Sequence, residues 1–304
     1  MRGRLILNGK KAGLPAVRAA VTAVRDSGHT LDVRVTWEAG DARRFVAEAA
    51  ADGVDRVIAG GGDGSVSEVA AALMDLDTAD RPEFGLLPLG TANDFATACG
   101  VATDPGVALL LAVTVAAVPV DVGRVDGGWF VNVATGGFGA AVTAETPVEL
   151  KNFIGGGAYT IMGLLRALDF RPYACSIDTA GGTMTGEFVV GAICNGRQAG
   201  GGQRLAPQAV IDDGLFDVVF LRPFPVAAAP QVAAELATRT ADGEFVVHRR
   251  LSWLELGAPA PIPVNLDGEP RTATRYRFEC VPRALRVALP QDCPCLGAAH
   301  PLRS

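Results

Sequence analysis

The first 120 residues alternate short apolar runs with stretches of helical period. The apolar runs predict strands at residues 4–8, 31–37, 54–59 and 84–87. Apolar positions spaced by three or four predict helices at 16–25, 41–51, 65–74 and 93–99. The nearly apolar stretch 106–120 is too short to span a bilayer and indicates a helix followed by a strand, because Thr114 and Pro119 interrupt it. Strands and helices that alternate at this spacing predict βαβ units and a parallel sheet.

The hydrophobic pattern changes after about residue 120. Short runs, many with a period of two, predict strands at 129–133, 173–178, 187–194, 216–221, 245–256, 262–266, 276–281 and 285–289. Asp-Gly and Gly-Gly pairs at 181–182, 213–214 and 267–268 indicate hairpin turns between them. We therefore expect a mainly antiparallel β-sandwich or barrel, with helical insertions near 140–168 and 229–240.

The two patterns together predict two domains. An α/β domain over residues 1–123 would precede a β-rich domain over 124–289, with the boundary near 120–127. A chain of 304 residues is long enough for each domain to have its own hydrophobic core. The C-terminal segment 290–304 is a candidate to rejoin the first domain.

Composition places the chain among globular proteins, with 49% hydrophobic and 20% charged residues. The net charge of −6 argues against nucleic acid as a partner, because phosphate backbones attract basic surfaces. Residues 1–8 hold no apolar stretch long enough for a signal peptide, so we expect a cytoplasmic protein. No feature of the sequence indicates an oligomeric state.

The cysteines and histidines do not follow a pattern typical of zinc binding or catalysis. Cys293-Pro-Cys295 lies near the C-terminus without a second cysteine pair or a histidine at zinc-site spacing. The histidines are His29, His248 and His300, and none of them neighbours a candidate nucleophile. We therefore expect neither a structural zinc site nor histidine-based catalysis.

A glycine-rich turn follows the third predicted strand. It reads Gly60-Gly-Gly-Asp-Gly64, and a helix-like stretch begins directly after it. Glycines at a strand-to-helix turn let backbone N–H groups approach a phosphate closely. Because a carboxylate repels phosphate, Asp63 is expected beside a metal ion, a bound water or a hydroxyl group that loses its proton.

A second polar loop follows the fourth predicted strand and reads Pro88-Leu-Gly-Thr-Ala-Asn-Asp-Phe95. In a parallel sheet both loops leave the carboxyl ends of their strands, so both can line one crevice. Together they supply glycine amides, the Thr91 hydroxyl, the Asn93 amide and the Asp94 carboxylate. This set of groups predicts a polyphosphate bound together with a divalent ion.

Three common ligand motifs are not found, and structural readings of the two loops stay open. There is no G-x-x-x-x-G-K-[ST] phosphate loop and no G-x-S-x-G nucleophile turn, and a dinucleotide fingerprint would need glycine at Ser65. Ser65 and Glu68 fit a capping box. Asp63 fits a turn residue of unusual backbone conformation, and Asn93-Asp94 fits the cap of the following helix.

The two loops, GGGDG and PLGTANDFA, resemble the catalytic domain of diacylglycerol and sphingosine kinases. The similarity is greatest to the bacterial YegS-type lipid kinases and extends from residue 5 to about residue 296. Further matching stretches are LILNGK, VRVTWEAGDA, FVNVATGGFG, CNGRQAGGGQ and NLDGEP. These motifs are specific as a set, although GGDG alone also occurs in NAD kinases and phosphofructokinases.

The resemblance implies a first domain like that of NAD kinases and diacylglycerol kinases. It also implies transfer of the γ-phosphoryl group of ATP to a lipid hydroxyl with Mg²⁺. Asp63 and Asp94 would organise the metal ion and its waters, and Glu269 would act as the general base. A further cation, with Ca²⁺ as a candidate, would be held by Asp213 and the backbone oxygens of Val210 and Leu215. The implied nucleotide contacts are Thr36, Gly62, Asp63, Gly64, Ser65, Val66, Ser67, Glu68 and Thr91.

The chain departs from the family pattern at two positions after the glycines. Ser65 replaces the usual threonine and keeps its hydroxyl, and Ser67 stands where asparagine is common. Neither change removes an acidic group. Considered without the resemblance, Glu269 after Asp267-Gly268 and Asp213 before Gly214 fit ordinary turns.

The expected partner is a membrane lipid such as diacylglycerol or phosphatidylglycerol, met during transient contact with the cytosolic membrane surface. Residues 149–168 fit either a mobile cover of the lipid site or an ordinary packed helix. Two alternatives stay open. One is a kinase of a soluble acceptor such as NAD or a sugar phosphate, and the other is a regulator that binds lipid or nucleotide without catalysis.

Overall fold

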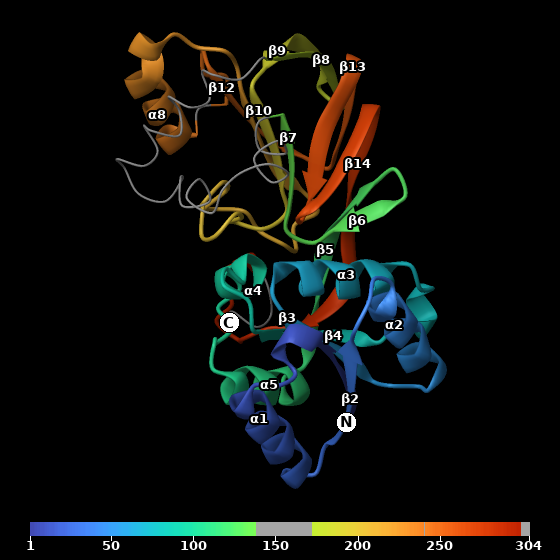
Figure 1. Cartoon of the computed structure of the whole chain (residues 1–304). Helices are drawn as coiled ribbons and strands as arrows, with labels where there is room; N and C mark the ends of the chain where they lie inside the picture. The colour runs from blue at the N-terminus through green and yellow to red at the C-terminus, as the bar shows by residue number, and fades with distance from the viewer. Residues whose placement is uncertain (138–171, 240, 299–304) are drawn as a thin grey trace. The chain divides into compact units, whose positions relative to one another are not determined.

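The computed structural model describes residues 1–137, 172–239 and 241–298 (Figure 1). The chain divides into two compact units. The first comprises residues 1–122, 211–213 and 282–304, and the second comprises 123–210 and 214–281. The helical insertion predicted near 140–168 and the candidate cover at 149–168 lie outside the described residues.

The first unit is organised around parallel strands. β1 (Arg2–Asn8) pairs with β2 (Thr30–Thr36) on one side and β3 (Arg56–Gly61) on the other, and β4 (Glu83–Pro88) pairs with β3. The order β4-β3-β1-β2 is extended beyond β4, where Val287 pairs with Phe84 in parallel register. The predicted parallel sheet is therefore confirmed.

Helices cover both faces of this sheet. α1 (Pro15–Asp26) packs against α5 (Pro105–Thr114), and α2 (Asp41–Ala51) packs against α3 (Asp63–Met74). In Figure 1, α1 and α5 lie below the strands, and α3 lies above them. Shorter helices in the connections are α4 (Asp94–Ala98) and the 3₁₀ turns at Gly9–Lys11 and Thr78–Asp80. Fully covered faces explain why the strands read as continuous apolar runs.

The second unit contains antiparallel ladders. Its strands are β5 (Ala117–Val125, shared with the first unit), β6 (Gly128–Phe130), β7 (Val133–Gly137), β8 (Tyr173–Thr179), β9 (Gly182–Phe188), β10 (Val190–Cys194), β11 (Phe216–Leu221), β12 (Val246–Leu251), β13 (Trp253–Leu266) and β14 (Glu269–Ala288, also shared). The central order is β12-β11-β10-β7-β13-β14, with β8 and β9 attached to β13 and β6 attached to β5. The predicted mainly antiparallel arrangement is confirmed.

Aromatic side chains fill the core of the second unit. Phe130 stacks on Phe216 with 5.5 Å between ring centroids, and Phe278 meets Phe130 edge-on at 6.4 Å. Helix α8 (Ala229–Thr238), preceded by a 3₁₀ turn at Val226–Ala228, confirms the predicted helix near 229–240. None of the helices in the described ranges is both long and apolar enough to cross a membrane.

Two long strands replace several shorter ones that the apolar runs predict. β13 and β14 continue through polar and small residues, with a register shift in β13 between Gly257 and Ile262. The predicted strands at 262–266, 276–281 and 285–289 are therefore wrong in their ends. A paired strand is held by backbone hydrogen bonds, so it extends past the point where apolar alternation stops.

Candidate functional site

In the first unit β2 and β3 lie on opposite sides of β1, so the order of the strands reverses at β1. The chain passes from β1 to β2 on one side and then crosses back to β3 on the other. The loops after β1 and β3 therefore diverge at the carboxyl ends of these strands, which is where open α/β sheets bind ligands. Asn8 ends β1 beside Thr36 of β2, and its Nδ2 lies 3.5 Å from the Ser65 Oγ. We call this region the carboxyl edge of the sheet.

The glycine loop (60–65) and the partner loop (88–95) touch through their backbones at this edge. A Cβ atom added to Gly90 would lie 2.5 Å from the Gly62 Cα, which leaves no room for a side chain. The Leu89 N–H donates to the Gly61 carbonyl at 2.7 Å, which continues the β3–β4 pairing into the loops. The contact brings together the predicted site residues of both loops.

Asp63 and Asp94 are the acidic residues that meet there. Asp63 is the first residue of α3, and Asp94, 3% exposed, is the first residue of α4. The Phe95 N–H donates to the Asp63 Oδ1 at 3.4 Å, so the start of α4 faces this carboxylate. Burial, followed by repulsion from the Asp94 carboxylate, raises the pKa of Asp63. A nearby cation would relieve both effects.

The capping-box and turn readings of the glycine loop are wrong. The N-cap of α3 is Gly62, so Ser65 is the third residue inside the helix and not its cap. A Cβ atom on Gly61 would lie 2.2 Å from the Ser65 Oγ, so this hydroxyl packs directly on the loop. Asp63 has no positive φ and belongs to the helix. The glycines complete the strand-to-helix change in fewer residues than the sequence reading allowed.

Asn93 closes the partner loop and does not cap α4 with its side chain. Its φ of 52° is left-handed, its Oδ1 accepts the Gly90 N–H at 2.8 Å, and its Nδ2 donates to the Gly90 carbonyl at 2.9 Å. The amide that the sequence offers to a ligand is therefore used within the loop. Thr91, between these two residues, is exposed.

The other predicted nucleotide contacts differ in exposure. Gly64 and Glu68 are exposed, whereas Val66 and Ser67 are 4% and 6% exposed. The side chains of Val66 and Ser67 therefore face the interior of the first unit. The Val66 N–H donates to the Gly62 carbonyl at 3.1 Å, so the direct contacts predicted for these two residues stay a prediction.

Asp41 holds the loop that follows Thr36, a role that the sequence patterns did not predict. Its carboxylate accepts the Trp37 N–H at 2.6 Å and the Glu38 N–H at 3.1 Å, which holds the loop after Thr36. The Trp37 N–H, and after it the Arg44 guanidinium, lower the pKa of Asp41 to about 2. The available signal was an acidic residue at the start of a predicted helix, shortly after a predicted strand.

Glu269 lies in the second unit, directly after a two-residue hairpin turn. Leu266 pairs with Glu269, and Asp267 and Gly268 between them have φ values of 49° and 105°. Positive φ at both central residues is the type I′ geometry that favours Asp-Gly, so the predicted turn is confirmed. Glu269 is exposed, and its carboxylate makes no hydrogen bond or ion pair within the described part of the chain. Its role as a base stays a prediction.

The predicted cation residues Val210, Asp213 and Leu215 flank a turn in which Gly214 has a φ of 75°. The neighbouring Asp212 accepts the Gly297 N–H at 2.7 Å through its Oδ1. In residues 1–137, 172–239 and 241–298, no three acidic, cysteine or histidine side chains gather as a metal site. A site of one carboxylate and two carbonyl oxygens is of another kind, so this cation also stays a prediction.

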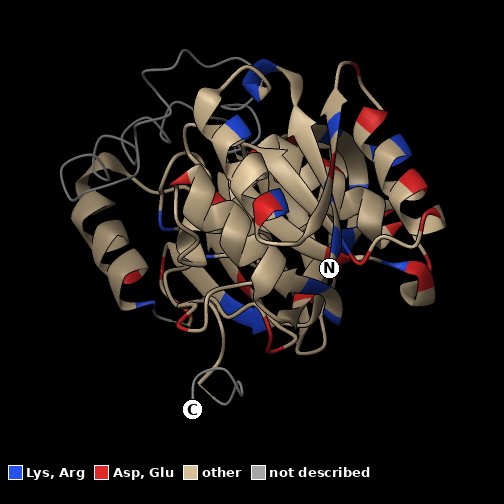
Figure 2. Cartoon of the chain, turned by 90° about the horizontal axis from the view of Figure 1, so that it is seen from below, with Lys and Arg blue, Asp and Glu red and all other residues tan. Residues whose placement is uncertain are grey.

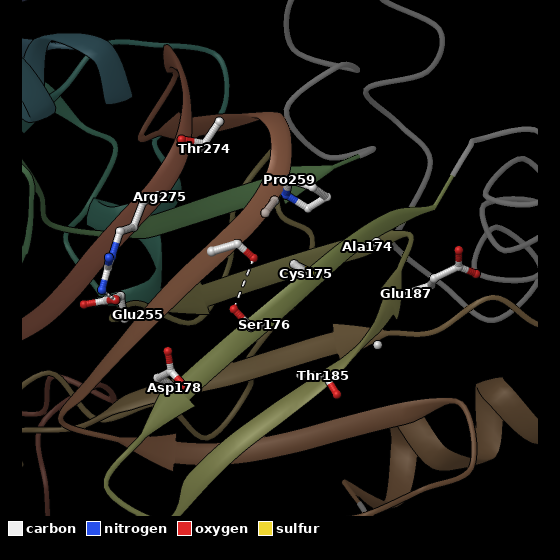
Figure 3. Close-up of a pocket in the computed structure, with 13 residues that line it drawn as sticks. Ala174, Cys175, Ser176, Asp178, Thr185, Glu187, Glu255, Pro259, Thr274 and Arg275 are labelled. Atoms are coloured by element: carbon white, nitrogen blue, oxygen red, sulfur yellow. Dashed lines mark hydrogen bonds and ion pairs between the residues drawn. The ribbon is translucent and has the colours of Figure 1, made fainter.

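A pocket of about 790 Å³ lies in the second unit among β8, β9, β13 and β14 (Figure 3). Glu255 forms an ion pair with Arg275 there, and the Ser176 hydroxyl donates to the Gly257 carbonyl at 3.4 Å. None of the predicted site residues lines this pocket. This pocket therefore does not coincide with the predicted site residues.

The backbone positions of basic and acidic residues, coloured blue and red, are interspersed along the elements seen in Figure 2. Several of these residues form exposed ion pairs, such as Arg44 with Glu48 at 3.2 Å and Arg43 with Asp75 at 2.8 Å. Exposed pairs of this kind contribute little to stability. The exclusion of nucleic acid as a partner, made from net charge, stays a prediction.

Known proteins match the chain over nearly its whole length. The diacylglycerol kinase catalytic domain matches residues 2–125, and the YegS C-terminal NAD kinase beta sandwich-like domain matches residues 132–289. A protein of Shewanella frigidimarina named "Probable lipid kinase YegS-like" is 51% identical, covering 96% of this chain and 95% of its own. One of the same name from Yersinia enterocolitica is 48% identical, covering 96% of this chain and 98% of its own.

A solved structure shares the fold. The crystal structure of a diacylglycerol kinase from Bacillus anthracis str. Sterne has a TM-score of 0.74 and 21% sequence identity, and covers 96% of this chain and 98% of that one. At this identity the likeness concerns the fold alone. Together with the family models it confirms the predicted fold class, a parallel α/β domain followed by a mainly antiparallel β-sandwich domain.

Proposed function

Because this chain belongs to the YegS-like family of lipid kinases, we propose that it transfers the γ-phosphoryl group of ATP to the hydroxyl group of a membrane lipid such as diacylglycerol or phosphatidylglycerol. Kinase activity and the use of ATP follow from the family. The acceptor, the metal ion and the roles of individual residues are the proposal. The observation that best supports it is the contact of the two loops, which unites Asp63 and Asp94 at the carboxyl edge.

The residues of this edge fit Mg²⁺. Mg²⁺ usually takes one or two protein carboxylates and completes its shell with phosphate oxygens and water. Asp63 and Asp94 supply two carboxylates, and the raised pKa of Asp63 means that its negative charge is poorly compensated without a cation. When bound, Mg²⁺ would neutralise charge on the phosphates of ATP.

The glycine loop and the start of α3 hold the phosphates of ATP in this proposal. The first N–H groups of a helix have no partner within the helix and carry positive partial charge. Such groups are available at the start of α3, which has 12 residues. Backbone amides of residues 62–65, ahead of the first intrahelical bond from the Val66 N–H to the Gly62 carbonyl, and the hydroxyls of Thr36, Ser65 and Thr91 would bind and orient the nucleotide.

Glu269 is the general base of the proposed reaction. Its carboxylate takes the proton of the acceptor hydroxyl while that oxygen bonds to the γ-phosphorus and the bond to the leaving ADP oxygen breaks. A carboxylate that is exposed and makes no bond to other described residues is free to accept this proton. Asp213, with the backbone oxygens of Val210 and Leu215, would hold a Mg²⁺ or Ca²⁺ ion with a structural or regulatory role.

The proposed acceptors are bilayer components, so the enzyme would meet them during transient contact with the cytosolic surface of a membrane. The test is a kinase assay with labelled ATP, Mg²⁺ and mixed micelles of diacylglycerol or phosphatidylglycerol. We expect label on a lipid, and loss of that label when EDTA removes the metal. No labelled product across a broad lipid panel would overturn the proposal. Label on NAD or a sugar phosphate without detergent would favour a soluble acceptor.

A further inference from the structure

The hairpin turn before Glu269 is tied to a distant part of the second unit. The Asp267 carboxylate accepts three successive backbone N–H groups: Val131 at 2.7 Å, Asn132 at 3.2 Å and Val133 at 2.8 Å. The Asp267 N–H in turn donates to the Val133 carbonyl at 3.1 Å. The turn is therefore fixed to the chain just before β7 by both the side chain and the backbone of one residue.

A second side chain fixes the same turn from within. The Asn265 Oδ1 accepts the Gly268 N–H at 2.6 Å, and Asn265 is only 5% exposed. The two polar side chains that precede Glu269 in the segment 265–269 are thus engaged in holding the turn. Glu269 is the acidic residue of this segment that remains available to a substrate.

We propose that Asp267 is a positioning residue. By accepting hydrogen bonds from the N–H groups of Val131, Asn132 and Val133, it fixes the position of the Glu269 carboxylate. This inference rests on the proposed function, in which Glu269 is the base. Both oxygens of the Asp267 carboxylate are engaged by these N–H groups. Its contribution is geometric. Proton transfer requires the base within hydrogen-bond reach of the acceptor hydroxyl, and small displacements are costly.

The first test replaces Asp267 with Ala and measures steady-state kinetics with the best lipid. We expect kcat to fall about 100-fold, as for a misplaced catalytic group, while KM for ATP stays unchanged because the nucleotide contacts lie in the first unit. Asp267→Asn keeps one acceptor oxygen and should lose less than Asp267→Ala. An Asp267→Ala enzyme with unchanged kcat overturns the inference.

The chain offers a matched control in the same unit. Asp126-Gly127 joins β5 to β6 with φ values of 30° and 78°, and the Asp126 Oδ2 accepts the Arg277 N–H at 3.1 Å. This turn has the same Asp-Gly sequence and positive φ at both residues, but it precedes no candidate base. Asp126→Ala should therefore keep kcat within about twofold, as an exposed substitution does. An equal fall of kcat in both variants would overturn the positioning role.

The second test asks whether Asp267 acts through Glu269. Two residues that work as a unit give non-additive losses, so Asp267→Ala should cause no further fall in a Glu269→Gln background. A purely structural residue would lower the rate by the same factor in both backgrounds, and that result would overturn the inference.

Hydrogen exchange gives a readout that does not depend on turnover. The amides of Val131 and Val133 should exchange faster in Asp267→Ala than in the wild type. Unchanged exchange would show that Asp267 does not hold the segment 131–133 and would overturn the inference. Failure of the proposed function has a different signature. It would appear as a wild type without lipid kinase activity or a fully active Glu269→Gln, with the exchange result intact.

Discussion

The candidate acidic groups of the two units lie in opposite environments. Asp63 and Asp94 in the first unit lie close together in two loops whose backbones touch, and burial, followed by repulsion from Asp94, raises the pKa of Asp63. Glu269 in the second unit is exposed after a rigid turn, and its carboxylate makes no bond to other described residues. The contrast fits cation binding in the first unit and proton transfer by a residue of the second. A crowded buried pair favours a cation, whereas an accessible carboxylate on a fixed backbone suits a base.

Removing the exposed carboxylate should have the largest effect. Glu269→Gln keeps the size of the side chain and cannot accept a proton, so we expect kcat to fall about 1,000-fold, within the range for lost general-base catalysis. Because the Glu269 side chain makes no hydrogen bond or ion pair with the described residues, the melting temperature should not change. Steady-state kinetics and thermal unfolding of the same preparation check both statements. A large fall in melting temperature would contradict the described isolation of this side chain.

Removing a charge from the buried pair should lower activity less and raise stability. Asp63→Asn weakens the binding of the metal ion, and we expect kcat to fall about 100-fold, as when one electrostatic contact of a transition state is lost. The same change relieves repulsion with Asp94, so the unliganded variant should melt at a higher temperature than the wild type. Calorimetry without nucleotide or metal measures this, and a lower melting temperature would show that Asp63 is a stabilising residue.

The pH dependence sharpens the same comparison. Since the pKa of Asp63 is raised above 3.8, its contribution to stability is fully present below that pH and is lost as the pH rises through the folded value. The stability advantage of Asp63→Asn should therefore be smallest at acidic pH and grow toward neutral pH. An advantage that shrinks as the pH rises would mean that the charged form of Asp63 is the favoured one. Melting curves across a pH series decide between them.

A change at the loop contact should have the smallest effect. The added Cβ of Gly90→Ala would lie 2.5 Å from the Gly62 Cα, so the loops must separate slightly. We expect KM for ATP to rise about tenfold, equivalent to about 1.4 kcal/mol of lost binding. Gly13→Ala is the control, because a Cβ atom there meets nothing within 4 Å and Gly13 has no positive φ. Equal KM values for ATP in both variants would show that the loop contact does not contribute to nucleotide binding.

The sequence predicts well where local pattern decides the structure. Buried strands appear as apolar runs, and the loops after the third and fourth strands carry the glycines that allow their contact. Asp267-Gly268 is a reliable turn signal because positive φ at two successive positions restricts the residues that fit. The family resemblance rests on the same short motifs, which is why it could be stated from the sequence.

The sequence fails where a residue's role depends on a distant partner. The capping-box reading of Ser65 assumed a later helix start than the glycines produce. Asn93 looked available to a ligand, but its amide binds Gly90 within the folded loop. The partners of Asp267 lie more than 130 positions earlier in the chain, so strand pairing alone brings them together. The residues next to Asp267 in the sequence therefore do not predict its hydrogen-bond partners.

The first unit is built from separate segments of the chain, which has a consequence for its folding during synthesis on the ribosome. Its last strand segment, which places Val287 beside Phe84, belongs to the final piece of this unit, residues 282–304. Domains usually fold in the order in which they emerge. Here the first unit emerges early but cannot complete its sheet until the whole second unit has been made. During that interval β4 is an open edge, the kind of surface that recruits chaperones or pairs with another chain.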